Sequence, residues 1–171
     1  MISKKMETEL NTQINRELYS AYLYLSMATY LADEHLSGMA NFMKIQAQEE
    51  MMHAMKIYGY VEEQGGRVIL DAIEKPPSKF ENAQEIFNQS LQHEKFVTKS
   101  INDLVNLAIS ESDHATKTFL DWFVTEQVEE EANMDDIVHK IKLVGGQGHG
   151  LLMLDGQLGA RISPVTVNTA E

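Results

Sequence analysis

The sequence predicts an all-α fold: a four-helix bundle with a long crossover between helices two and three, and a short C-terminal fifth helix. Prolines occur only at Pro76, Pro77 and Pro164, so two long stretches contain no helix-breaking residue. These stretches are rich in Ala, Leu, Met, Glu, Gln and Lys, which favour helix. Glycine pairs at 65–66 and 145–146 end each stretch.

The spacing of apolar residues predicts where the four long helices lie. In the first, apolar residues recur three or four positions apart, as on one face of a helix. They are Leu10, Ile14, Leu18, Ala21, Leu25 and Ala28. Asn82 and Asp113 are candidate N-caps for the third and fourth helices, and the glycines at 65–66 suit the end of the second. The predicted ranges are 3–32, 38–64, 83–109 and 114–144.

The connections between these helices determine the topology. The first and third connections are short, which makes each flanking pair antiparallel. The middle connection, 65–82, has 18 residues and can reach about 60 Å when extended, enough to run the length of the bundle. It therefore predicts a crossover, with Val68, Ile69 and Leu70 buried against the bundle or a neighbouring chain. The apolar run 151–154 predicts the fifth helix, and the tail 161–171 is expected to be weakly ordered.

Composition narrows the class of protein further. The length of 171 residues suits one domain spanning 1–171. A net charge of −12 disfavours nucleic acid and favours cations as partners. No run of 18 apolar residues exists, so we expect no membrane span. The absence of an apolar secretory segment leads us to expect a cytoplasmic location. Since the chain has no cysteine, any metal must be held by oxygen and imidazole ligands.

Polar side chains interrupt the apolar stripe of every predicted long helix. Glu17 and Glu50 are 33 residues apart, as are Glu94 and Gln127. Each second member opens an i, i+3 pair, which places both side chains on one helix face. Inward carboxylates and i, i+3 pairs from four helices are typical of a di-metal carboxylate bundle. The interrupting residues are Glu17 and Tyr24, then Glu50 and His53, then Glu94, and finally Gln127 and Glu130.

Charge balance agrees with a two-metal site. Four inward glutamates carry the charge that two divalent cations neutralise, and without cations their burial is costly. Carboxylates with one imidazole suit iron or manganese, with zinc able to compete. Further acidic residues flank the pattern and are either an accessory cation site or a solvated acidic face. They are Glu49, Glu126, Glu129 and Glu131.

Together these motifs resemble those of bacterial non-haem ferritins, and the resemblance covers essentially the whole chain. It rests on Glu17 with Tyr24 in E-L-Y-S-A-Y-L-Y, on Glu50-x-x-His53 preceded by a glutamate, on Glu94, and on the E-Q-x-x-E motif that ends at Glu130. The resemblance implies a hollow homo-oligomeric cage of 24 subunits that stores ferric mineral. It also implies ferroxidase activity, in which O₂ or H₂O₂ oxidises Fe(II).

The resemblance also implies roles for individual residues. Glu17, Glu50 and His53 would bind the first iron, with Glu50 bridging to a second iron held by Glu94 and Glu130. Gln127 would hydrogen-bond near the face where oxygen binds, and Tyr24 would stand beside the first iron. The residues expected at a third iron site are Glu49, Glu126, Glu129 and Glu130.

The sequence differs at several positions from other protein groups that share this type of bundle. Bacterioferritins also resemble this chain, but they carry Glu-x-x-His where this sequence has Gln127-x-x-Glu130, which argues against a permanently occupied di-iron cofactor. Met51 next to Glu50 is expected to pack rather than to bind haem, so no haem is expected. A rubrerythrin-like di-iron peroxidase is the alternative, although that group usually adds a cysteine-bound iron. A DNA-protecting mini-ferritin would need more than Lys4 and Lys5 as a basic tail.

Overall fold

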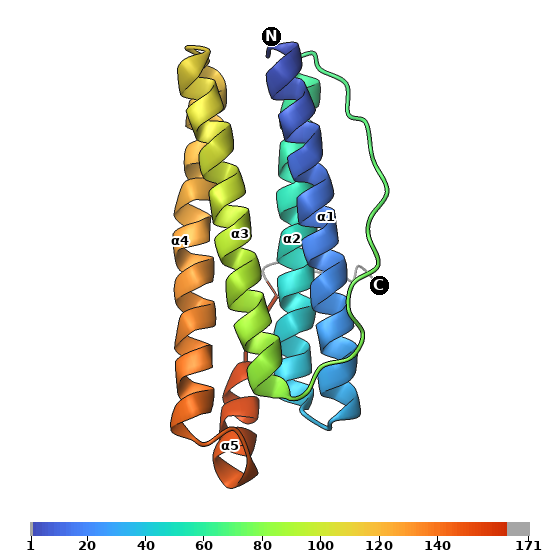
Figure 1. The fold of residues 1–171 in the computed structure, drawn as a ribbon, viewed down its shortest axis with the longest axis vertical. Helices are drawn as coiled ribbons and strands as arrows, with labels where there is room; N and C mark the ends of the chain where they lie inside the picture. Colours follow the sequence, from blue (N-terminus) through green and yellow to red (C-terminus); the bar gives the residue numbers. More distant parts are fainter. Residues whose placement is uncertain (1, 164–171) are drawn as a thin grey trace, which may run out of the picture.

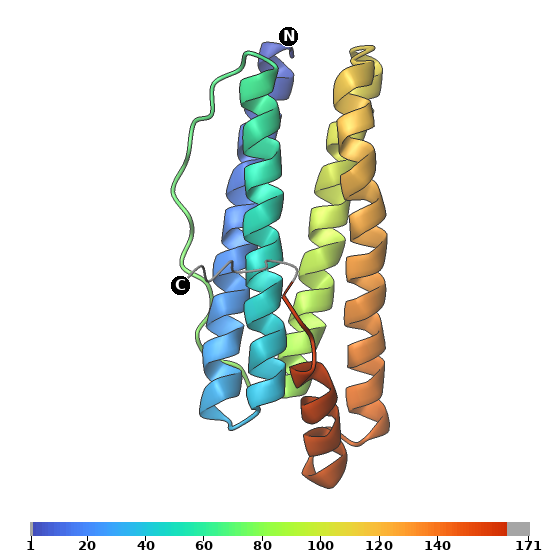
Figure 2. The same cartoon turned by 180° about the vertical axis from the view of Figure 1, so that it is seen from behind.

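The computed structural model describes residues 2–163, which form five helices and no strand. Two antiparallel hairpins, α1–α2 and α3–α4, lie side by side, and α5 packs beside the end where α2 begins (Figures 1 and 2). This is the predicted four-helix bundle with its crossover and fifth helix. The helices are α1 (Lys4–Asp33), α2 (Ser37–Glu63), α3 (Ala83–Ser110), α4 (His114–Leu143) and α5 (Gly148–Gly159).

Side-chain caps define where three of the helices begin. The Asn82 Oδ1 accepts a hydrogen bond from the Glu85 amide at 2.9 Å, and the Asp113 Oδ1 accepts one from the Thr116 amide at 3.0 Å. Both predicted N-caps are therefore confirmed, and Ser3 caps α1 in the same way. The four long helices end within one or two residues of their predicted limits. The fifth is longer than its apolar run suggested.

The crossover between α2 and α3 runs along the outside of α1 for most of the bundle's length (Figures 1 and 2). Asn11 attaches it at one end, since its Nδ2 donates to the Arg67 carbonyl at 3.0 Å and its Oδ1 accepts from the Ile69 amide at 2.8 Å. Ser26 donates to the Pro77 carbonyl at 2.6 Å near the other end. The crossover thus makes α2 and α3 parallel, as predicted.

Two of the apolar residues predicted to pack inward from the crossover are exposed, whereas Phe80 near its end is buried in the core. Ile69 and Leu70 are 61% and 63% exposed, and Val68 is only half-buried. The prediction that they pack on their own bundle is therefore wrong for Ile69 and Leu70. Burial against a neighbouring chain stays a prediction.

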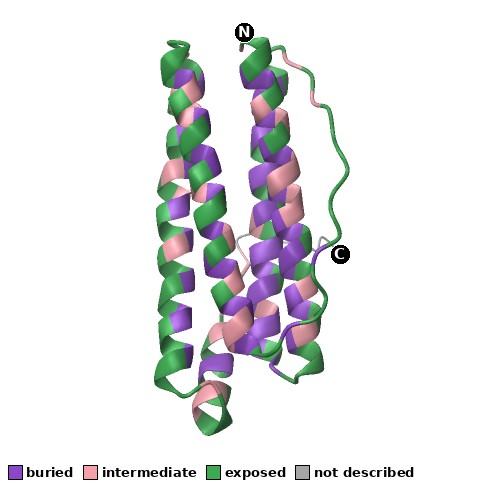
Figure 3. Cartoon of the chain, viewed as in Figure 1, coloured by how far each residue is buried: buried purple, intermediate pink, exposed green. Residues whose placement is uncertain are grey.

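Two apolar clusters fill the bundle, and a polar layer separates them. Buried residues lie on the facing sides of the helices (Figure 3). One cluster extends toward α5 and includes Met27, Met43 and Phe87, while the other fills the opposite end. None of the described helices is long and apolar enough to cross a membrane. The buried polar residues of the layer include Gln13, Glu17, Ser20, Gln46, Glu50, His53, Ser90, Glu94, Gln127 and Glu130.

One residue of the predicted apolar stripe faces away from the core. Leu25 is 46% exposed, whereas Tyr24 and Ala28 are buried. The prediction for Leu25 is wrong because steps of three and four only approximate the 3.6-residue turn, so a chosen stripe drifts along a long helix.

The position of α5 is determined by close contact with the start of α2. A Cβ added at Gly38 would overlap the Asp155 backbone carbonyl, and one at Gly159 would lie 3.0 Å from the Gly38 Cα. The Asp155 Oδ1 accepts a hydrogen bond of 2.7 Å from the Met39 amide, which satisfies one of the free amides in the first turn of α2. The chain after α5 then turns back along α2. Residues 164–171 of the predicted tail lie outside the described residues.

Gly38 and Gly59 form a matched pair for testing this contact. We expect Gly38→Ala to reduce the free energy of unfolding by about 1–3 kcal/mol, because backbone must move to admit the methyl group. Apart from its own helix backbone, the methyl group of Gly59→Ala meets no atom of residues 2–163 within 4 Å, so this change should cost nothing, or stabilise α2 by up to about 1 kcal/mol. Urea unfolding followed by circular dichroism measures both. Equal effects of the two changes would contradict the backbone contact.

Candidate metal centre

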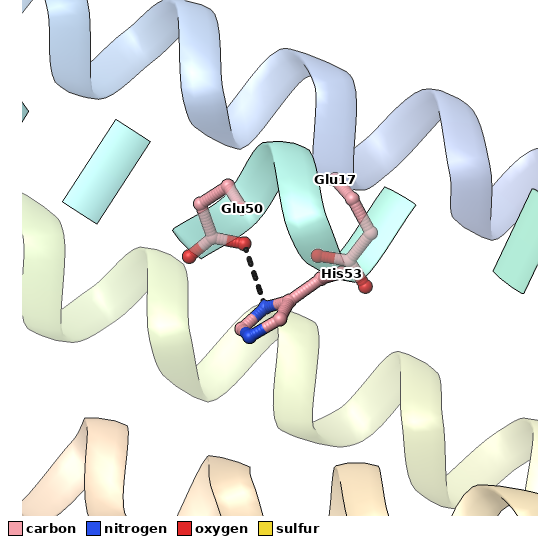
Figure 4. Close-up of side chains that lie close together, drawn as sticks. All are labelled: Glu17, Glu50 and His53. Atoms are coloured by element: carbon pink, nitrogen blue, oxygen red, sulfur yellow. Dashed lines mark ion pairs between the residues drawn. The ribbon is translucent and has the colours of Figure 1, made fainter. Parts of the chain in front are cut away.

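The polar layer contains a compact group of potential metal ligands. Glu17 comes from α1, and Glu50 and His53 come from successive turns of α2. One ligand atom from each lies within 4.8 Å of the others, and all three side chains are buried (Figure 4). The His53 Nδ1 is 3.3 Å from the Glu50 Oε2. The i, i+3 spacing on α2 and the antiparallel pairing with α1 bring these groups together.

The other hairpin contributes further predicted residues to the same layer. The Gln127 Nε2 donates to the Glu94 Oε2 at 3.2 Å, and the Tyr24 hydroxyl donates to the Glu94 Oε1. The Glu130 Oε2 accepts a hydrogen bond of 2.6 Å from Gln46 of α2. The close cluster therefore belongs to the first hairpin, while Glu94 and Glu130 approach from the second.

One oxygen of Glu17 identifies where a cation fits. The Glu17 Oε1 accepts a hydrogen bond from the Gln13 Nε2 at 2.7 Å. The Glu17 Oε2 is the only buried side-chain nitrogen or oxygen among residues 2–163 without a hydrogen-bond partner. An unpaired buried carboxylate oxygen is costly, and a bound cation would satisfy it. The donor set is thus suited to a metal ion.

Burial also shifts the protonation equilibria of these groups. It raises the pKa of Glu17 to about 7 and that of Glu130 to about 8, and it raises the pKa of Glu50 well above its usual range. The charge of Glu94 adds to the shifts of Glu50 and Glu130. Burial lowers the pKa of His53 to about 4, so its imidazole is neutral at pH 7 and has a free lone pair. Cations that bind here must displace protons from the carboxyls.

The predicted accessory residues lie on one side of the centre and are less buried. Glu49 and Glu126 are half-buried and line an open hollow of about 610 Å³ next to His53, while Glu129 is exposed. Burial, followed by the charge of Glu129, raises the pKa of Glu126. Glu49 already has a cationic partner, the Arg161 guanidinium, at 2.6 Å.

Several residues that contact the centre were missed by sequence reasoning. Gln13 and Gln46 donate to Glu17 and Glu130, and their signal was present, since they too are 33 residues apart, each four before a glutamate. Trp122 packs edge-on against His53, with ring centroids 5.4 Å apart. It is 40% exposed and follows no inward stripe, so no pattern identified it.

His93 is a further histidine close to the polar layer. It is half-buried between α1 and α3, and its Nε2 is 2.7 Å from the Ser20 hydroxyl. Burial lowers its pKa to about 4. It packs against the rings of Tyr19 and Tyr24.

A crossover bundle with a buried carboxylate–imidazole centre defines the class of protein: a ferritin-like helical bundle. The family model of the ferritin-like domain matches residues 7–144. A bacterial non-haem ferritin of Bacteroides fragilis is 44% identical over 161 residues, 94% of this chain and 100% of that protein. One from Campylobacter jejuni is 42% identical over 155 residues, 91% of this chain and 93% of that protein. The chain belongs to the ferritin family.

Solved structures agree with this assignment. An open-pore ferritin from the hyperthermophilic archaeon Archaeoglobus fulgidus superimposes with a TM-score of 0.93 at 51% sequence identity. The alignment covers 95% of this chain and 100% of that chain. A closed form of the same ferritin, engineered by mutagenesis, also has a TM-score of 0.93 at 51% identity.

The raised carboxyl pKa values predict how the stability of the metal-free protein depends on pH. Glu17 and Glu130 bind protons more tightly when folded than at the ordinary glutamate pKa of 4.5. The folded state therefore holds more protons than the unfolded chain between about pH 4.5 and pH 8. Their contribution is fully present below this window and is lost as the pH rises through it. We expect the free energy of unfolding to fall by more than ~1.4 kcal/mol from pH 5 to pH 8.

Urea unfolding of chelator-treated protein at pH 5, 6, 7 and 8 measures this loss. The double variant Glu17→Gln, Glu130→Gln should flatten the profile, and Glu62→Gln, Glu63→Gln at exposed positions should not. A wild-type profile as flat as that of the first variant would show that these carboxyls do not have raised pKa values.

Proposed function

We propose that this protein stores iron and that its buried centre is a ferroxidase that oxidises Fe(II). Membership of the ferritin family supports iron storage. The observation that carries the ferroxidase proposal is the Glu17–Glu50–His53 cluster with its unpartnered Glu17 oxygen. A buried site that lacks one positive partner is prepared to receive a cation.

Two Fe(II) ions are the proposed substrate of this centre. Glu17 and the neutral His53 would bind the first ion, Glu94 and Glu130 the second, and Glu50 would lie between them. Four carboxylates neutralise two divalent ions, which removes the mutual repulsion that the buried glutamates otherwise suffer. Two Fe(II) ions together supply the two electrons that reduce O₂ to peroxide, or H₂O₂ to water.

Neighbouring side chains would orient the ligands. The Tyr24 hydroxyl and the Gln127 amide both donate to Glu94, so each Glu94 oxygen has a fixed donor before a metal arrives. Such donors to ligating carboxylates define their orientation and adjust their affinity. Tyr24, whose hydroxyl is bonded to a proposed ligand, would also supply an electron to the reaction.

We also propose how the chain assembles and where further iron binds. The chain would form one domain that assembles into a homo-oligomeric cage of 24 subunits, where ferric oxyhydroxide is deposited. The exposed Ile69 and Leu70 of the crossover are suited to burial between subunits. A third iron would bind near Glu49, Glu126 and Glu129, in competition with Arg161.

Aerobic loading tests storage directly. Metal-free protein is given Fe(II) in air, at hundreds of ions per expected shell, and is then separated by size exclusion with iron detection. We expect iron to co-elute with a very large particle at hundreds of ions per shell. Retention of only about two irons per chain, with turnover that needs peroxide and a reductant, would instead indicate a rubrerythrin-like di-iron peroxidase.

Removal of two ligands from the cluster tests the centre. We expect Glu50→Ala, His53→Ala to slow the initial rate of Fe(II) oxidation by on the order of 100-fold or more, since loss of a group that only hydrogen-bonds to a metal ligand already costs about 10–100-fold in metal sites. The rate is followed by ferric absorbance in stopped flow. Glu62→Ala, His114→Ala makes the same chemical change at exposed positions and should oxidise Fe(II) normally. An unchanged rate in the first variant would place the oxidation elsewhere.

A further inference from the structure

Gln46 connects an arginine to a carboxylate of the centre. The Gln46 side chain is fully buried, its Nε2 donates to the Glu130 Oε2 at 2.6 Å, and its Oε1 accepts from the Arg161 Nη1. A guanidinium has only N–H donors and can meet only the oxygen of the amide. Arg161 therefore holds the Gln46 amide so that its NH₂ group is aimed at Glu130.

Besides Gln46, the guanidinium of Arg161 has two further partners. Its Nη2 pairs with the Glu49 Oε2 at 2.6 Å, and the group lies over the Phe42 ring, 4.4 Å from its centroid. Arg161 follows closely after Gly159, where α5 meets Gly38 of α2. The contact between α5 and α2 thus brings the arginine onto Gln46.

The same arrangement occurs on the other side of the centre. The Gln13 Nε2 donates to the Glu17 Oε1 at 2.7 Å, and the Gln13 Oε1 accepts from the Arg16 Nη1 at 3.3 Å. The Ser100 hydroxyl donates to the same Gln13 oxygen. The sequence has three arginines, and two of them hold a buried glutamine that donates to a carboxylate of the centre.

We propose that Arg161 and Arg16 are positioning residues that lock the amides of Gln46 and Gln13, and so fix the orientation of the Glu130 and Glu17 carboxylates for metal binding. The inference rests on the proposed function and adds to it how the carboxylates of Glu17 and Glu130 are held. Without Arg161, the Gln46 amide is free to turn its oxygen toward the Glu130 carboxylate, which repels it. The carboxylate then loses its hydrogen-bond donor. Part of the free energy of metal binding is spent on orienting the carboxylate, so the metal affinity falls. Without Arg16, the Gln13 oxygen keeps only the Ser100 hydroxyl as its donor, so that amide is held less firmly.

Anaerobic titration with Co(II) tests this proposal without oxidation chemistry. We expect two Co(II) ions per wild-type chain, with visible d–d bands that report their coordination. Arg161→Gln should weaken the binding of one of the two Co(II) ions by about tenfold and alter the bands, a loss typical of removing a group that orients a metal ligand. Arg161→Lys keeps the charge but not the planar guanidinium, which reaches two partners at once, so it should recover only part of the affinity. Arg67→Gln, at an exposed position, is the matched control and should bind as wild type.

A double-mutant cycle separates positioning from general stability or charge. Gln46→Met removes the link, so adding Arg161→Gln to it should cause no further loss of Co(II) affinity. A full tenfold loss in the Gln46→Met background would overturn the proposal, because the arginine would then act through its charge or through Glu49. Circular dichroism establishes that each variant is folded. If Arg161→Gln does not fold, Arg16→Gln with Gln13→Met provides the corresponding cycle on the other side, where a smaller loss is expected because Ser100 also holds Gln13.

The outcomes distinguish this proposal from the function on which it rests. If wild type binds no Co(II), the proposed centre and the positioning role both fail. If wild type binds two ions and Arg161→Gln binds them with unchanged affinity and spectrum, only the positioning role fails.

Discussion

Burial of several carboxylates in the middle of the core is the constraint on which the structure depends. Glu17, Glu50, Glu94 and Glu130 are at most 3% exposed, and burial raises the pKa of each. An apolar layer at this level would stabilise the fold more, because buried charges without partners are unfavourable. The polar layer divides the core into two apolar clusters. The apolar surface buried in these clusters must offset the free-energy cost of burying the carboxylates. The layer is therefore a functional feature that the rest of the bundle supports.

The crossover determines where this layer can form. Because it runs along α1 and makes α2 and α3 parallel, the two hairpins present their inward faces to each other. Glu17 and Glu50 then meet Glu94 and Glu130 at one level, from four different helices. Helices are rigid supports, so the proposed ligands are held in place without a metal. Donors to Glu94 and Glu130 from Tyr24, Gln127 and Gln46 add to this preorganisation.

Local periodicity explains which parts could be predicted from the sequence. Helix limits, both side-chain caps and the inward glutamates depend on residues within a few turns, where spacing is informative. The 33-residue repeat added the relation between hairpins. Arg161 could not be predicted, because its contact with Gln46 depends on how α5 crosses α2 at Gly38. The exposure of Leu25 was missed because small errors in helical phase accumulate over a long helix.

The two sides of the centre differ in what must be in place before they are complete. Arg16 and Gln13 belong to the same helix as Glu17, so that side is assembled as soon as α1 packs between its neighbours. On the other side, Glu130 depends on Gln46 from the opposite hairpin and on an arginine beyond α5. Its carboxylate is therefore fully oriented only when the hairpins have joined and α5 has docked. If Glu130 binds metal as proposed, the affinity of that side would depend on the docking of α5, so a change at the Gly38 contact would alter metal binding without altering a ligand.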